Sequence, residues 1–390
     1  MNVDTRVGSK YYWLSTFLGR DKLLRGVESL LFTVDRFGDL AGKGGNDTNA
    51  CFGHPGSTPL VSSPGAPAPS SKGLSIFAVN EDGHLFERPS ADKPIEGEPK
   101  NGPNNKAAWI DHGRPDNKQI VHPPGALINN SSLFVVVEDG RLFELKWLCN
   151  QTPGTWVDHG RPSPGVMIIS APSEAIYNSE FFVVGDNGRV YRHQNTGSQA
   201  DPAWTWKDLN LPLSDDKMRA INIPQVVGPD SVFVVTDTGR LVDLERAGTG
   251  WTWANDYGQP FYQPVISATA TSDSVYATTD YPDSHLTQLR PLPTPADELD
   301  QVEALRHTTV AKKLWVDYGY IPFKWNPASN DNYVNVVTSA GIMTAPSSQG
   351  HMALVFGKDG EAFAPLWDDS SKKWYWENLG YFCSDNGYFF

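Results

Sequence analysis

Two stretches of the sequence decide the fold. One is LFVVVEDGRLFEL at Leu133–Leu145 with TWVDHGRP at Thr155–Pro162, and the other is IFAVNEDGHLFER at Ile76–Arg88 with WIDHGRP at Trp109–Pro115. In both, an apolar strand, an Asp-Gly turn and a second alternating strand precede a polar loop, Trp-x-Asp and a Gly-x-Pro exit. An Asp-Gly turn between two strands is typical of a two-residue β-hairpin, because Gly adopts the positive φ that the turn needs. Each stretch therefore predicts a hairpin followed by one more strand.

The same pattern recurs along the chain in weaker copies. They lie at Leu30–Leu40, Phe181–Arg192, Val232–Leu244, Val275–Leu289 and Leu354–Phe363, which makes seven units. The turn residues are Gly38, Gly83, Gly140, Gly188, Gly239, Ser284 and Gly360, and the aromatic series is Trp109, Trp156, Trp206, Trp253, Trp315 and Trp376. A repeat of this length indicates one supersecondary unit per copy.

Four strands per unit predict a β-propeller. Besides the hairpin and the Trp segment, each unit has an alternating segment before its hairpin, such as 119–127. Four-stranded antiparallel units at this period are typical of propeller blades, whereas helical repeats would need a 3.6-residue period. We therefore predict an all-β, single-domain, seven-bladed β-propeller of four-stranded antiparallel blades. The approximate blades are 10–57, 58–117, 118–164, 165–214, 215–262, 263–324 and 325–390 of the 1–390 chain.

Three long polar insertions interrupt the repeat at 89–106, 292–313 and 325–350. Their composition predicts surface loops. One short helix is expected in the second insertion, where Thr294 would cap it, Pro295 would lie in its first turn, and Leu299, Val302 and Leu305 would share one face.

Charge and hydropathy exclude two classes of partner. Lys and Arg number 32 against 45 Asp and Glu, and the resulting net charge of -13 repels nucleic-acid phosphates and anionic lipid. Apolar runs such as Leu133–Val137 fall far short of the roughly 20 residues that a membrane helix needs. The sequence therefore predicts a soluble chain without a nucleic-acid or membrane partner.

The cysteines and the N-terminus give little information on disulfides and on the cellular compartment. Cys51, Cys149 and Cys383 include no CxxC pair, so we expect neither a cysteine metal site nor a disulfide scaffold, and whether Cys51 pairs with Cys383 stays open. Charged residues such as Asp4 and Arg6 precede any apolar stretch, unlike the order in a secretory signal, which slightly favours the cytoplasm over secretion and leaves the compartment undetermined.

Together, the Trp-x-(Asp/Leu)-x-Gly segments and the DG hairpins resemble the repeat of the PLL-like seven-bladed lectins. The resemblance to the fungal fucose-specific lectins and the tectonin propellers is looser. It covers roughly residues 27 to 380. Such proteins look like multivalent sugar binders with aromatic-lined pockets between adjacent blades or on one ring face, so the resemblance implies several glycan sites. This chain departs from them in its unequal units and long insertions.

The candidate ligand-binding residues come from the two plainest units. They are Glu87, Trp109, His112 and Arg114, and at matching positions Glu144, Trp156, His159 and Arg161. Aromatic rings can stack on sugars, while Arg and His can hydrogen-bond hydroxyls or a carboxylate. We expect no cofactor and no metal.

Each candidate also has a structural interpretation. The Trp series is expected to pack the blade interfaces, and the Asp residues that follow are expected to accept turn N–H groups. His112 and His159 give way to Leu209, Tyr257 and Tyr318 in later units, so the fold does not require His there. The column of Glu87, Glu144, Arg192, Asp243 and Gln288 is predicted to be a solvated edge, and Arg141, Arg189 and Arg240 to form solvated salt bridges on one rim.

Two other function classes stay open. GxSxG, HExxH, P-loop and GxGxxG motifs are all missing, but propeller enzymes assemble sites from single residues around the channel. The alternative to a lectin is therefore a cofactor-independent lyase, isomerase or cyclase with a single pocket at the channel, which the long insertions would suit. A protein-interaction platform is the third possibility. Several similar pockets between blades favour the lectin, and one deep pocket with converging titratable groups favours the enzyme.

Overall fold

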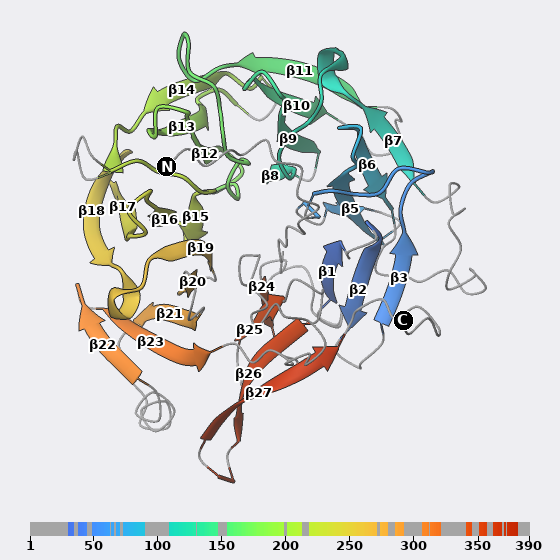
Figure 1. Ribbon diagram of the computed structural model, residues 1–390. Helices are drawn as coiled ribbons and strands as arrows, with labels where there is room; N and C mark the ends of the chain where they lie inside the picture. Colours follow the sequence, from blue (N-terminus) through green and yellow to red (C-terminus); the bar gives the residue numbers. More distant parts are fainter. Residues whose placement is uncertain are drawn as a thin grey trace, which may run out of the picture.

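Seven antiparallel sheets form a ring in the computed structural model of this protein (Figure 1). This architecture confirms the predicted all-β, seven-bladed β-propeller. The structure describes residues 30–34, 38–44, 49–62, 64–65, 68–70, 73–89, 109–129, 131–146, 154–198, 201–212, 218–270, 274–279, 285–291, 306–311, 313–320, 341–344, 351–356, 362–368, 370–371 and 373–380. The helix expected at 294–305, Cys149 and Cys383 lie outside these residues.

We number the sheets as blades 1 to 7 in chain order. Blade 1 contains β1 (Leu30–Val34), β2 (Leu40–Gly44) and β3 (Asn49–Gly53). Blade 2 contains β4 (Ala68–Ser70), β5 (Gly73–Val79), β6 (Leu85–Arg88) and β7 (Ile110–Gly113). Blade 3 contains β8 (Gly125–Ile128), β9 (Ser132–Val136), β10 (Leu142–Lys146) and β11 (Thr155–Gly160). Blade 4 contains β12 (Glu180–Val184), β13 (Val190–Asn195) and β14 (Trp204–Asp208).

The remaining blades continue around the ring. Blade 5 contains β15 (Gln225–Val227), β16 (Ser231–Val235), β17 (Leu241–Ala247) and β18 (Gly250–Gly258). Blade 6 contains β19 (Val265–Ala270), β20 (Val275–Thr279), β21 (His285–Pro291), β23 (Lys313–Tyr320) and β22 (Arg306–Val310), in that spatial order. Blade 7 contains β24 (Gly341–Thr344), β25 (His351–Phe356), β26 (Ala362–Asp368) and β27 (Lys373–Gly380). Short 3-10 turns occupy Pro115–Asn117 and Pro260–Tyr262.

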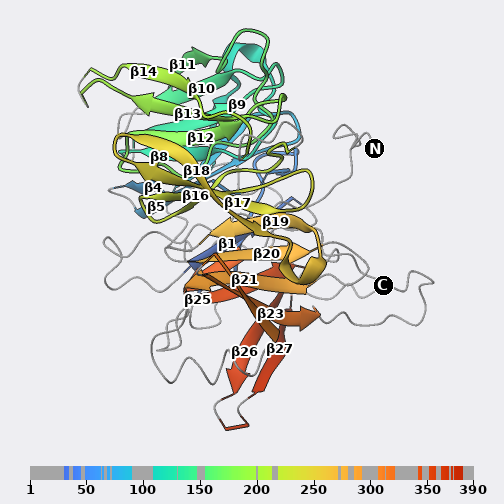
Figure 2. The same ribbon diagram turned by 90° about the vertical axis from the view of Figure 1, so that its left-hand side faces the viewer.

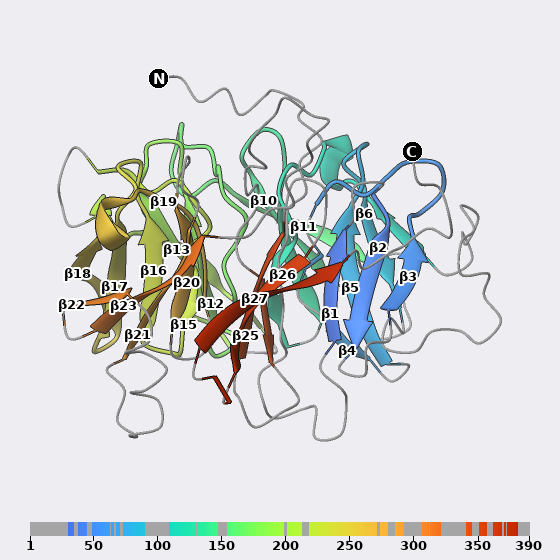
Figure 3. The same ribbon diagram turned by 60° about the horizontal axis from the view of Figure 1, so that its bottom comes forward.

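In most blades the strands run outward from the ring axis in chain order. Figure 1 places β8, β15, β19 and β24 nearest the centre and β11, β14 and β18 at the periphery. The first and last blades lie side by side in Figures 1 and 3, so the ring closes between the chain's two ends. Figure 2 shows the β26–β27 hairpin projecting beyond the other blades.

The hydrophobic core is divided among the interfaces between neighbouring blades. On β9, Leu133 and Val135 pack with blade 2, whereas the alternate residues Phe134 and Val136 pack with blade 4. All four side chains are fully buried. A strand buried on both faces needs apolar residues at every position, which explains the continuous LFVVV run.

The hairpin turn is one residue longer than predicted. In blade 3 the N–H of Gly140 donates to the carbonyl of Val137, and the N–H of Val137 donates to the carbonyl of Arg141, so residues 138–140 form the loop. Gly140 has a φ of 75°. A three-residue loop ending in a left-handed residue still requires Gly, which is why the Asp-Gly signal identified the hairpin correctly but not its length.

The turn glycine also joins each blade to the next one. The carbonyls of Gly83 and Gly140 accept hydrogen bonds from the N–H groups of Ile120 and Ile168, at 3.1 and 3.2 Å. A Cβ at Gly140 would lie 2.5 Å from the side chain of Met167, so this approach leaves no room for a larger residue. Gly38, Gly188 and Gly239 accept equivalent bonds from Leu60, Ala220 and Val265.

The repeated tryptophans hold the blades together, as their structural interpretation predicts. The indole N–H of Trp156 donates to the carbonyl of His112 in the preceding blade at 3.1 Å, and that of Trp206 donates to the carbonyl of His159 at 3.1 Å. Trp253, Trp315 and Trp376 make the same bond to Leu209, Tyr257 and Tyr318.

In blades 3, 4 and 5 the Asp that follows the Trp binds the turn arginine of its own blade. Asp158 Oδ1 accepts the N–H of Gly160 at 2.7 Å, and its other oxygen pairs with Arg141 of the turn. Asp208 and Asp256 pair in the same way with Arg189 and Arg240. These contacts confirm both the predicted turn role of the Asp series and the salt bridges of the turn arginines.

Two of the expected surface insertions contain strands. Residues 306–310 form β22, which extends blade 6 to five strands, and residues 341–344 form the innermost strand of blade 7. These segments are short and flanked by polar residues, so composition alone concealed them. No helix among the described residues has the length and apolar character to cross a membrane.

Candidate functional site

A buried polar pair recurs between the third and fourth strands of several blades. In blade 2, His112 Nε2 lies 2.9 Å from Glu87 Oε2, and the Ser75 hydroxyl donates to Glu87 Oε1 at 2.7 Å. In blade 3, His159 Nε2 lies 3.0 Å from Glu144 Oε2. These glutamates come from the matching ends of β6 and β10, and each faces the next strand of its own sheet.

Blades 5 and 6 make the same contact with different residue types. The Tyr257 hydroxyl donates to Asp243 at 2.9 Å, and the Tyr318 hydroxyl donates to Gln288 at 2.7 Å. The replacement of His by Tyr in later units therefore accompanies a change of its partner on the third strand. Because the pair persists while its chemistry varies, its first role is to satisfy buried polar groups.

The prediction that this column is a solvated edge is wrong. Glu87, Glu144, Arg192, Asp243 and Gln288 are all at most 8% exposed. Their side chains lie under the neighbouring strand and blade rather than at the ring surface. The charge varies along this column because each side chain has a different partner on the next strand. In blade 4 that position is Leu209, which has no polar side chain, and Arg192 pairs instead with Glu180 at 3.1 Å.

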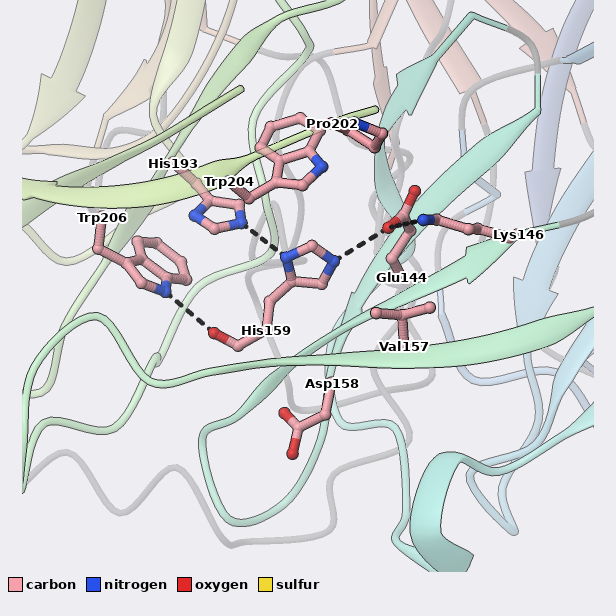
Figure 4. Close-up of a pocket in the computed structure, with 9 residues that line it drawn as sticks. All are labelled: Glu144, Lys146, Val157, Asp158, His159, His193, Pro202, Trp204 and Trp206. Carbon is pink, nitrogen blue, oxygen red and sulfur yellow. Dashed lines mark hydrogen bonds and ion pairs between the residues drawn. The ribbon is translucent and has the colours of Figure 1, made fainter. Parts of the chain in front are cut away.

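A cavity of about 350 Å³ lies between blades 3 and 4 at their outer strands (Figure 4). We call it the blade 3/4 cavity. Its lining residues are Glu144, Lys146, Val157, Asp158 and His159 of blade 3, with His193, Pro202, Trp204 and Trp206 of blade 4. Lys146, Asp158 and Pro202 are exposed, so the cavity meets solvent at the ring's circumference.

His193 distinguishes this interface. It lies on β13 opposite Trp206, in the column that holds Leu145, Leu244 and Leu289 in other blades. The imidazole contacts two indoles, with ring centroids 4.9 Å from Trp204 and 4.0 Å from Trp206. Blade 2 has Arg88 in this column, so leucine is not required there, and the contact of an imidazole with two indoles is what sets this interface apart.

Burial keeps His193 neutral. The residue is 1% exposed, and loss of solvent, followed by the proximity of His159, lowers the pKa of its imidazole to about 2. Its Nε2 lies 3.0 Å from Nδ1 of His159, as Figure 4 shows. One of these two nitrogens must carry the hydrogen and the other must accept it.

Glu144 supplies the negative charge of the cluster. Burial alone would raise the pKa of its carboxyl, but hydrogen bonds from His159 and Ser132, together with the Lys146 charge, outweigh it and lower that pKa. The carboxylate is thus ionised at neutral pH and accepts the Nε2 hydrogen of His159. Both ring nitrogens of His159 are consequently engaged.

The structure separates the eight predicted ligand residues. Glu144 and His159 line the blade 3/4 cavity, whereas Trp156 packs at the blade 2/3 interface. Arg161 bends back to the turn of its own blade, where its Nη2 donates to the carbonyl of Asp139 at 2.7 Å. Thus the His and Arg of one DHGRP motif lie at different places.

The first copy of the motif follows the same division. His112 and Glu87 form the buried pair, Arg114 reaches the carbonyl of Asp82 at 3.5 Å, and Trp109 is buried in the core between blades 1 and 2. None of these four residues lines the blade 3/4 cavity.

Sequence analysis gave no role to five of the lining residues, namely Lys146, Val157, His193, Pro202 and Trp204. Two signals were readable: Trp204 precedes Trp206 by two residues and so shares its strand face, and His193 occupies a column that holds leucine in three other blades. Neither signal alone places the residue opposite Glu144 of another blade. Among the described residues, no group of three or more His, Cys, Asp or Glu side chains is placed to hold a metal ion.

Comparison with known proteins supports the fold. No protein-family model and no curated protein matches the chain. Among solved structures, the yeast heterotrimeric Nup82-Nup159-Nup116 nucleoporin complex matches with a TM-score of 0.51 and 10% identity, covering 94% of this chain and 96% of that chain. A Bacteroides uniformis protein provisionally assigned as a 6-phosphogluconolactonase matches with a TM-score of 0.51 and 9% identity, covering 90% and 94%. At such identities the likeness shows the propeller fold alone.

Proposed function

We propose that this chain is a carbohydrate-binding, lectin-like propeller whose principal site is the blade 3/4 cavity. The observation that carries the proposal is the partly exposed indole of Trp204 beside the ammonium of Lys146 in a cavity of about 350 Å³. That volume lies at the lower end of the range for small-molecule sites and suits one sugar ring. An aromatic face with a few polar groups is what the apolar face and hydroxyls of a sugar require.

The position between outer strands also supports a lectin. It matches the inter-blade pockets that the resemblance to PLL-like lectins implies. Further sites of the same kind belong to the proposal, because Trp374 of blade 7 occupies the column of Trp204 and its ring centroid lies 4.9 Å from that of Tyr318 in blade 6. Weak single sites of this kind would gain avidity together.

The cluster of titratable groups favours binding over the alternative lyase, isomerase or cyclase. A general acid or base must offer a nitrogen or oxygen to the substrate, yet both ring nitrogens of His159 are engaged by Glu144 and His193. On the inner segments, the exposed side chains at matching positions are aliphatic, namely those of Val61, Val121, Ile169, Ile221 and Ile266.

A glycan array followed by calorimetry tests the proposal. We expect binding to at least one class of glycan, with an affinity that falls about tenfold or more in Trp204→Ala because a stacked aromatic is lost. Tyr375→Ala is the matched control, since Tyr375 is an exposed aromatic outside the cavity. A blank array, or equal losses in the two variants, would contradict the proposal.

A further inference from the structure

Both carboxylates of the blade 3/4 cavity are already bound to partners within the protein. Glu144 accepts from His159 and Ser132, lies 3.5 Å from the Lys146 ammonium, and is 2% exposed. The carboxylate of Asp158 is bound to Arg141 and to the N–H of Gly160, and Figure 4 draws it pointing away from the cavity's imidazoles. Neither carboxylate is therefore placed to receive a ligand's hydroxyl.

The donors are in surplus. Lys146 has three N–H groups on an ammonium, its side chain is 44% exposed, and its ion pair is the 3.5 Å approach to Glu144. The indole N–H of Trp204 is buried and has no acceptor within the described part of the chain. Figure 4 draws this nitrogen on the edge of the indole that is nearer to Glu144 and Lys146. A buried donor without a partner is costly, so a ligand oxygen that reaches it would be favoured.

The repeat does not require a basic side chain at this position. The residue that follows the buried column by two positions is Lys146 in blade 3, Gln194 in blade 4, Glu245 in blade 5 and Arg290 in blade 6. The fold thus tolerates a neutral, acidic or basic residue there. A cation at the mouth of the cavity is consequently a property of the site and not of the repeat.

We infer that the ligand of the blade 3/4 cavity is an acidic sugar, a uronic acid whose carboxylate binds Lys146 while its ring lies against Trp204. This inference rests on the proposed function and adds the ligand class. A ligand carboxylate supplies acceptor oxygens for the Lys146 ammonium and the Trp204 N–H, and a charge-assisted hydrogen bond is stronger than one to a hydroxyl. A neutral hexose differs only by a hydroxymethyl group in place of that carboxylate.

Matched sugar pairs test the inference by isothermal titration of the full chain. The probes are the methyl glycosides of glucose, galactose and mannose, each against its uronic acid. In at least one pair the uronic acid should bind about tenfold more tightly. That preference should disappear in Lys146→Gln and persist in Lys146→Arg. Lys207→Gln removes the same charge from an exposed position outside the cavity and should change nothing.

The outcomes separate the two claims. Equal affinity within every pair, tighter binding of the neutral sugar, or a preference that survives Lys146→Gln would overturn the acidic-sugar inference and leave the lectin proposal standing. Failure of all six glycosides together with a blank glycan array would overturn both.

Discussion

Blades 2 and 3 carry the same DHGRP motif, yet their histidines meet different neighbours. His159 Nδ1 lies 3.0 Å from His193 of the next blade, whereas His112 Nδ1 is buried without a hydrogen-bond partner in the described residues. The residue of blade 3 that corresponds to His193 is Leu145. Identical motifs therefore build a polar cavity wall at one interface and a packed one at the other, because the adjacent blade supplies the second half.

Gly154 strengthens this contrast. It occupies the place of Trp204 in blade 3, so no aromatic ring faces His112 from that position. A Cβ at Gly154 would approach a side-chain carbon of Leu145 to 2.7 Å. The blade 2/3 interface thus lacks both residues that make the blade 3/4 cavity polar and aromatic.

The largest expected effect is on stability, and it tests the inter-blade tryptophan that the two interfaces share. Trp156→Ala and Trp206→Ala should each lower the free energy of unfolding by about 3 kcal/mol, since each removes a packed indole and its inter-blade hydrogen bond. Urea denaturation measures both losses. Trp206→Ala alone should also abolish glycan binding, because His193 loses one of its two indole neighbours. Equal glycan affinities in the two variants would break the contrast.

The pH dependence of stability tests the residue that distinguishes the blade 3/4 interface from the blade 2/3 interface, the buried His193. The unfolded His193 binds a proton below its ordinary pKa near 6.5, whereas the folded residue stays neutral down to about 2. Its neutral form therefore stabilises the fold fully above pH 6.5, and this contribution is lost as the pH falls toward 2. By pH 4.5 the loss should reach roughly 3 kcal/mol.

His193→Leu should remove this part of the acid sensitivity. Leu fits the column in three other blades, so stability at pH 7 should stay within about 1 kcal/mol of the parent chain. Urea titrations at pH 7 and pH 4.5 measure the difference. An unchanged slope with pH would show that His193 is not the neutral buried group described above.

A smaller effect is expected from the buried pairs themselves. Glu144→Gln and Glu87→Gln each weaken a charge-assisted bond to a histidine, at a cost of about 1 to 2 kcal/mol. Only Glu144→Gln should change glycan affinity, since Glu87 lies outside the cavity. If both variants bound glycan like the parent chain, the cavity wall would have no part in recognition.

The arginines of the motif should matter least. Arg114→Gln and Arg161→Gln remove a half-buried and an exposed side chain that reach turn carbonyls, so each should cost less than about 1 kcal/mol and leave glycan binding unchanged. A loss of glycan affinity in either variant would show that the arginine contacts the ligand. It would then support the interpretation of DHGRP as one ligand-binding unit.

Sequence reasoning recovered the fold because its signals are local. Gly140, Trp156 and Asp158 each bond backbone groups and recur at the same place in the pattern of every clear copy, so the repeat is visible along the chain. The hairpin loop was mis-sized by one residue, since Gly adopts a left-handed φ in both turn types.

The site was recovered only in part because it joins two blades. Glu144 and His159 carry a readable motif, but His193 and Trp204 lie in another unit whose motif has Leu209 in place of His. The varying charges in the column of Glu87 and Glu144 predicted a solvated edge. In the structure each of these side chains is buried, and its partner on a neighbouring strand varies with it. Only the three-dimensional register of neighbouring blades shows such pairs.

The most direct measurement is a crystal structure of the chain with the glycan that binds most tightly on the array. Our account predicts the ligand in the blade 3/4 cavity, with its ring against Trp204 and an oxygen on Lys146. A ligand bound instead in the central channel, or beside Glu87 and His112 at the blade 2/3 interface, would contradict it.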